Sequence, residues 1–214
     1  KKEQAAGAIL LVEKEIADMT EVVIRMFQRI RNTFSNRALA ATEEYKLAQV
    51  RDEDYADQMH HEISQYLVHC MDLPLTDNQR NNVSQMLEVV AQLESITDDC
   101  HSVSLLLSRS VEKKMTFAQE DLDRLDPYVE LVNRFVLFIQ EHINKHLTED
   151  KLSEAKTIED QIDLFRKNLK KVARKRLESG ADVKSELLYI DLVRQLEKIG
   201  DRAFSISEAL YLTK

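Results

Sequence analysis

The sequence predicts an all-α fold, an elongated six-helix bundle, and three features of its composition indicate this. Its 214 residues include 3 glycines and 2 prolines, where average usage would give roughly 15 and 11. Tight turns between strands need those residues, so sandwiches, barrels and Greek keys are excluded. Charged residues make up 32% and aromatic residues 6% of the chain, which is typical of long amphipathic helices. The 43% of hydrophobic residues suffices for a buried core.

The first three helices follow from apolar spacing and from signals at helix ends. Apolar residues recur every three or four positions from Ile9 to Ile30, which predicts the first helix. The second stops before Pro74, and the capping box Thr76-x-x-Gln79 opens the third. The expected ranges are residues 4–34, 39–70 and 76–109.

The second three helices have similar end signals. Thr116-x-x-Gln119 favours the start of a fourth helix, in which Pro127 indicates a kink or a restart. The fifth stops at Gly180, since glycine commonly follows a helix C-terminus. The expected ranges are residues 116–146, 149–177 and 183–212. Helices of about 30 residues are about 45 Å long, so the bundle should be elongated.

Charge and cysteine content exclude several classes of protein. The chain has 30 basic and 38 acidic side chains, a formal net charge of −8; this argues against nucleic acid as a partner, because phosphates need a positive surface. Cys70 and Cys100 form no Cys-x-x-Cys pair, which excludes zinc-finger and thioredoxin chemistry and favours two buried thiols over a disulfide. The longest apolar stretch, residues 8–12, is too short to span a membrane. The chain starts at Lys1 without Met, which suggests a piece of a longer protein.

An internal repeat divides the chain into two halves. Residues 93–98 match residues 196–201 at an offset of 103, and Glu53-x-x-x-Asp57 matches the motif that begins at Glu159 at an offset of 106. Each half therefore holds three helices, with acidic motifs on its second and third. The predicted units, packed side by side as one domain, are residues 1–112 and 113–214.

The repeated acidic motif is Glu-x-x-x-Asp, which places two carboxylates one turn apart on the same face of a helix. Like charges at this spacing cost a few tenths of a kcal/mol. Chance predicts about two such pairs from the composition, whereas the sequence has five. One of them spans Gly180 and is not helical. The other four fall at equivalent places of the two halves: Glu53/Asp57, Glu94/Asp98, Glu159/Asp163 and Glu197/Asp201.

These pairs predict one metal site in each half. The motifs on the third and sixth helices are interleaved with Leu and Ile, so their carboxylates are partly desolvated and should have raised pKa values unless a cation intervenes. Four carboxylates from two antiparallel helices suit Mg, Mn, Ca or iron. The alternative is a set of solvated acids that form ordinary salt bridges.

Two histidines distinguish the first predicted site from the second. His60 and His101 follow Asp57 and Asp98 by three positions and share their helix face. Nitrogen ligands would favour zinc, nickel or iron there, and leave the second site to harder cations. The counterparts in the second half are Arg166 and Phe204. The alternative is that both histidines are ordinary surface or core residues.

Leu196-Glu197-Lys198-Ile199-Gly200-Asp201 resembles the Glu-Arg-Ile-Gly-Asp signature of PhoU-like proteins. The duplicated three-helix plan is similar too, so the resemblance covers essentially the whole chain. Residues 57–67 resemble the PhoU-like tail of bacterial sodium/phosphate cotransporters. The resemblance implies a non-enzymatic regulator of phosphate transport on the cytoplasmic side of the bacterial inner membrane. It also implies a membrane transporter domain as partner, and multinuclear iron, zinc or Mg/Mn sites.

Two further features have competing explanations. The basic stretch Arg166–Arg176 is either a solvated face or a surface that docks on an acidic partner or anionic lipid. His142-x-x-x-His146 has zinc-like spacing but follows an apolar run that is more simply core. A homo-oligomer is compatible with the sequence.

Two other functions compete with phosphate regulation. A ferritin-like di-iron protein would need two Glu-x-x-His motifs, and the sequence has none. A metal-free helical scaffold would need only the apolar pattern.

Overall fold

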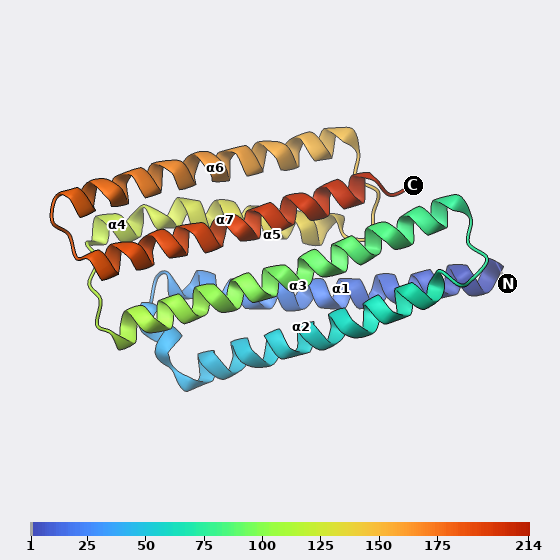
Figure 1. The fold of residues 1–214 in the computed structure, drawn as a ribbon, viewed down its shortest axis with the longest axis horizontal. Coiled ribbons are helices and arrows are strands. Elements are labelled where there is room, and N and C mark those ends of the chain that lie inside the picture. The colour runs from blue at the N-terminus through green and yellow to red at the C-terminus, as the bar shows by residue number, and fades with distance from the viewer. Residues whose placement is uncertain (1) are drawn as a thin grey trace.

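The structure, a computed structural model, describes residues 2–214 and confirms the all-α bundle (Figure 1). Six long helices and two short ones make up this part of the chain. They are α1 (Lys2–Thr33), η1 (Arg37–Ala41), α2 (Glu43–Cys70), α3 (Asp77–Glu112), α4 (Gln119–Asp123), α5 (Leu125–His142), α6 (Glu149–Glu178) and α7 (Val183–Tyr211).

Most helix ends follow the predicted signals, but α2 begins at Glu43 rather than near residue 39, after the short helix η1, and Thr116 does not cap α4. The capping box of Thr76 and Gln79 is present, and Gly180, at φ 90°, ends α6. Of the two interpretations of Pro127, a kink or a restart, the structure shows the restart, so residues 116–146 do not form one continuous helix. The short helix α4 precedes α5, whose first turn holds Pro127, where a residue without an N–H is tolerated. Asn144 takes a positive φ of 64° beyond the end of α5, so His146 lies outside the helix.

The long helices pack as two groups of three, and one core runs through both. Helices α1, α2 and α3 contact one another, as do α5, α6 and α7. The groups lie side by side (Figure 1) and meet through α3 against α7 and α1 against α5. Buried side chains from all six long helices form one hydrophobic cluster. The seams between α2 and α3 and between α6 and α7 therefore occupy equivalent places in the two groups.

Gly200, which lies within the second copy of the repeated motif, allows α6 and α7 to pack closely. A Cβ at this position would lie 3.1 Å from Cδ1 of Ile162, so the glycine lets α7 approach α6 closely. The position is flanked by Glu197 and Asp201, and the approach brings both toward the acidic residues of α6.

Cys70 and Cys100 are both buried and unbonded, as predicted. Among the helices between Lys2 and Tyr211, none has the combination of length and apolar character that crossing a bilayer requires.

Candidate metal centres

The acidic residues of the first half converge at the seam between α2 and α3. Carboxylate oxygens of Asp57, Glu94 and Asp98 all lie within 4.8 Å of one another. Glu53, one turn before Asp57, lies against Asp98, and its Oε2 is 3.1 Å from Nδ1 of His101. The structure thus gathers the four carboxylates of the first predicted site, with His101 beside them. We call these five residues the first cluster.

The first cluster has no cationic partner. Within residues 4–214, neither a lysine nor an arginine forms an ion pair with any of its four carboxylates. Burial, followed by the charge of Asp98, raises the pKa of Glu53 to about 7. Burial, followed by contacts with Asp57 and Asp98, raises the pKa of Glu94 to about 8. Such values are expected where carboxylates repel one another and no cation separates them.

The two histidines of the first half differ in position. His101 is about three-quarters buried, and its Nδ1 has no hydrogen bond of good geometry, although Glu53 is near. A buried ring nitrogen without a partner is costly, and coordination of a metal would satisfy it. His60 is partly buried and forms neither a hydrogen bond nor an ion pair in the described part of the chain. The three carboxylates of Asp57, Glu94 and Asp98 therefore fit a metal, and His101 lies next to this group through its contact with Glu53.

The acidic residues of the second half, at the seam between α6 and α7, have a different environment. Nη2 of Arg166 donates to Oδ1 of Asp163 at 2.5 Å, and the same guanidinium pairs with Glu197. Nζ of Lys156 lies 3.9 Å from Glu159. In the described residues, Glu159, Asp163, Glu197 and Asp201 do not form a close group of three like that of the first cluster. We call these four carboxylates with Arg166 the second cluster.

Comparison with solved structures connects this architecture with known proteins. No protein-family model and no curated protein matches the sequence. PhoU from Pseudomonas aeruginosa superposes with a TM-score of 0.86 at 17% identity, over 97% of each chain. The phosphate transport system regulatory protein PhoU from Streptococcus pneumoniae gives 0.82 at 15% identity, over 97% of this chain and 96% of that one. The chain has a PhoU-like fold.

A more distant PhoU-like structure shares the architecture. A PhoU-like phosphate regulatory protein from Shewanella oneidensis superposes with a TM-score of 0.63 at 14% identity, over 94% of this chain and 98% of that one. The PhoU-like fold that the six-residue signature implied is therefore confirmed, across nearly the full length of the compared chains.

Stability of the metal-free PhoU-like chain should decrease as pH rises from about 5 to about 8. Because the pKa values of Glu53 and Glu94 are raised to about 7 and about 8, the folded chain holds more protons than the unfolded chain in this range. These groups thus stabilise the fold at low pH and cease to do so as they ionise. Thermal melts with a chelator should show a lower Tm at about pH 8 than at about pH 5.

The matched control for this pH effect is the double variant Glu53→Gln/Glu94→Gln. The other carboxyls with raised pKa values, such as Asp99, stay as in the wild type. A double variant whose Tm falls as steeply with pH as that of the wild type would contradict the assignment.

The basic stretch of α6 does not form one solvated face. Arg166 and Arg176 turn inward, with side chains about one-fifth exposed. Arg176 pairs with Asp121 at 2.9 Å and with Glu186 at 2.9 Å. The residues that stay outward are Lys167, Lys171, Arg174 and Lys175. Any docking surface on α6 is therefore smaller than the sequence predicted.

Neither residue of the pair His142 and His146 sits in a ligand group. The ring of His142 lies 4.5 Å from that of Phe138, and the ring of His146 lies 6.4 Å from that of Tyr211. Their environment is aromatic packing, as the apolar run before them indicated.

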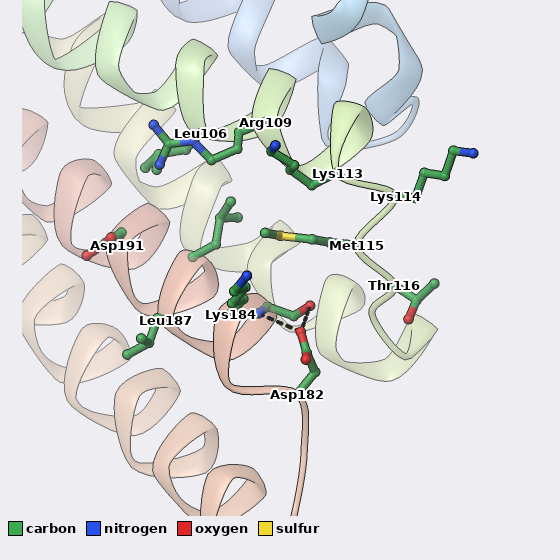
Figure 2. Close-up of a pocket in the computed structure, with 12 residues that line it drawn as sticks. Leu106, Arg109, Lys113, Lys114, Met115, Thr116, Asp182, Lys184, Leu187 and Asp191 are labelled. Atoms are coloured by element: carbon green, nitrogen blue, oxygen red, sulfur yellow. Dashed lines mark hydrogen bonds between the residues drawn. The ribbon is translucent and has the colours of Figure 1, made fainter.

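A recess of about 630 Å³ lies where α3 ends and α7 begins (Figure 2). Its cations are Arg109, Lys113, Lys114 and Lys184, and Lys114 points away from the other lining residues. Arg109 and Lys113 lie at the C-terminus of α3, where positive charge complements the helix dipole. Asp182 accepts hydrogen bonds from Ser185 as the N-cap of α7. We assign Arg109, Lys113 and Asp182 to the stability of the helix ends, whereas Lys184 lies at the N-terminus of α7, where positive charge does not complement the dipole.

Proposed function

We propose that this chain is a non-enzymatic, metal-binding regulator of phosphate transport. The observation that carries the proposal is the first cluster, in which four carboxylates and the His101 imidazole meet while no lysine or arginine of the described residues pairs with them. The PhoU-like fold supports the regulatory role, since one matched structure is a phosphate transport system regulatory protein by name and another a phosphate regulatory protein. Iron, zinc or manganese fits the mixed oxygen and nitrogen donors better than magnesium, which prefers oxygen alone.

We further propose that the chain is the cytosolic tail of a sodium/phosphate cotransporter and that its partner is the membrane domain. Support comes from residues 57–67, which resemble such tails and include one ligand of the first cluster. The coding sequence upstream of Lys1 tests this context. About eight apolar spans of about 20 residues are expected there, and an upstream region without them would contradict the cotransporter origin alone.

Phosphate uptake in a bacterial host that lacks its own PhoU-like regulator tests the regulatory role. The wild-type gene, expressed with its natural upstream region, should restore control of uptake when phosphate is plentiful. Asp98→Asn should fail to restore it, because the variant loses a carboxylate of the first cluster. Asp191→Asn, at an exposed carboxylate paired with Arg194 on α7, is the control and should act as the wild type. Equal control of uptake by both variants would refute a regulatory role for the metal.

A further inference from the structure

The second cluster contains a built-in cation at the place where the repeat predicts a metal. Arg166 extends from α6 and reaches a carboxylate on its own helix, Asp163, and one on α7, Glu197. The guanidinium is well covered, with about one-fifth of its side chain exposed, as is that of Glu197. Arginine suits this role because its planar fork holds two carboxylates at once and stays charged at all working pH values.

The two clusters differ at two equivalent positions, since Phe204 corresponds to His101 and an arginine replaces the other histidine. At the offset of 106 that relates Glu53 to Glu159, Arg166 corresponds to His60. His60 is shorter and makes no ion pair in the described residues, so the carboxylates of the first cluster lack a cation. Hydrogen bonding by Arg166 lowers the pKa of Asp163, and its charge opposes the rise that burial causes in the pKa of Glu197. Among the described residues, no lysine or arginine opposes the rise in the pKa values of Glu53 and Glu94.

We propose that Arg166 takes the place of a metal in the second cluster, so that only the first cluster binds one. The sequence prediction of two metal sites does not fit the second cluster, because a metal and a guanidinium cannot occupy the same position between Asp163 and Glu197. The proposal rests on the proposed function only for the metal in the first cluster.

Because only the second cluster contains an arginine, the two pairs of helices should be held together differently. The seam between α6 and α7 is held permanently by Arg166, which pairs with a carboxylate on each helix. In the described residues no lysine or arginine bridges the carboxylates of the first cluster, although Lys46 pairs with Glu112 elsewhere along the seam between α2 and α3. These carboxylates repel one another until a metal joins them. Binding or loss of metal should therefore change only the first half of the bundle and leave the second half as a fixed support.

Metal content measured by mass spectrometry, after the apo protein is loaded with zinc and desalted, tests this proposal. Asp201→Asn should retain the metal content of the wild type, because the second cluster binds none. In the Asp98→Asn background, which loses the first cluster, adding Arg166→Ala should restore zinc binding through the second cluster. Arg166→His, which copies the first half, serves as an alternative should the alanine variant not fold. Arg174→Ala, at an exposed residue of the same helix, is the control and should restore nothing.

Different outcomes overturn this proposal and the proposed function. A wild-type chain that binds no zinc, iron or manganese would refute the metal-binding function. An Asp201→Asn variant with about half the metal content of the wild type would show a second metal site and refute the proposed role of Arg166. Failure of both Arg166 variants to gain metal while folded, as judged by circular dichroism, would also refute it.

Discussion

An Asp98→Asn variant is expected to lose its bound metal. Asp98 lies in the group with Asp57 and Glu94 and also against Glu53, so the substitution removes a charge from the centre of the first cluster. Loss of an outer-shell partner already weakens metal binding on the order of 10–100-fold, and loss of a direct ligand should cost more. Isothermal titration of the chelated protein with zinc measures the change.

Thermal stability gives a second measure of the same loss. Metal that binds the folded chain stabilises it by about 2.7 kcal/mol at a concentration of 100 times Kd. Zinc should thus raise the Tm of the wild type and leave that of Asp98→Asn unchanged. Asp191→Asn should respond as the wild type does. Equal rises in Tm for Asp98→Asn and the wild type would show that the first cluster is not the metal site.

An Arg176→Met variant is expected to lose much of its stability without any effect on metal. The guanidinium of Arg176 donates to Glu186 and Asp121 and lies 4.7 Å from the centre of the Tyr189 ring. The side chains of Glu186 and Asp121 are only 8% and 11% exposed. Removal of the guanidinium leaves the buried carboxylate of Glu186 without a cation, while Asp121 keeps its 3.4 Å contact with Arg124. Breaking such a buried pair costs about 3–5 kcal/mol.

Thermal and urea unfolding measure this effect. For a chain of this size, 1 kcal/mol shifts Tm by about 2–4 °C, so a decrease on the order of 10 °C is expected. Arg174→Met, two residues away on the exposed side of α6, is the control and should change Tm little. A small effect for Arg176→Met would mean that Glu186 and Asp121 are hydrated rather than desolvated by the fold.

Much of the fold was predictable because its signals are local. Helices α1, α3, α6 and α7 begin and end close to the predicted residues, since capping side chains such as Thr76 and turn residues such as Gly180 act on their own segments. The sequence left open whether Pro127 marks a kink or a restart, because proline is compatible both with a kinked helix and with a first turn. Choosing between the two depends on how the chain enters the second group of helices.

The sequence by itself determined the helices and the placement of eight carboxylates at equivalent positions, because helical periodicity fixes which side chains share a face. The sequence also predicted that the two sets differ, because only the first half has histidines beside its carboxylates. Only the tertiary structure decided that one set has a guanidinium between its carboxylates. Whether a carboxylate has a cation beside it depends on the reach of a side chain across a helix seam, and that reach depends on how closely two helices pack. Arg166 could be read from the sequence as one more charge on a basic stretch, or as the counterpart of His60. Its position between Asp163 and Glu197 follows from the packing of α6 on α7.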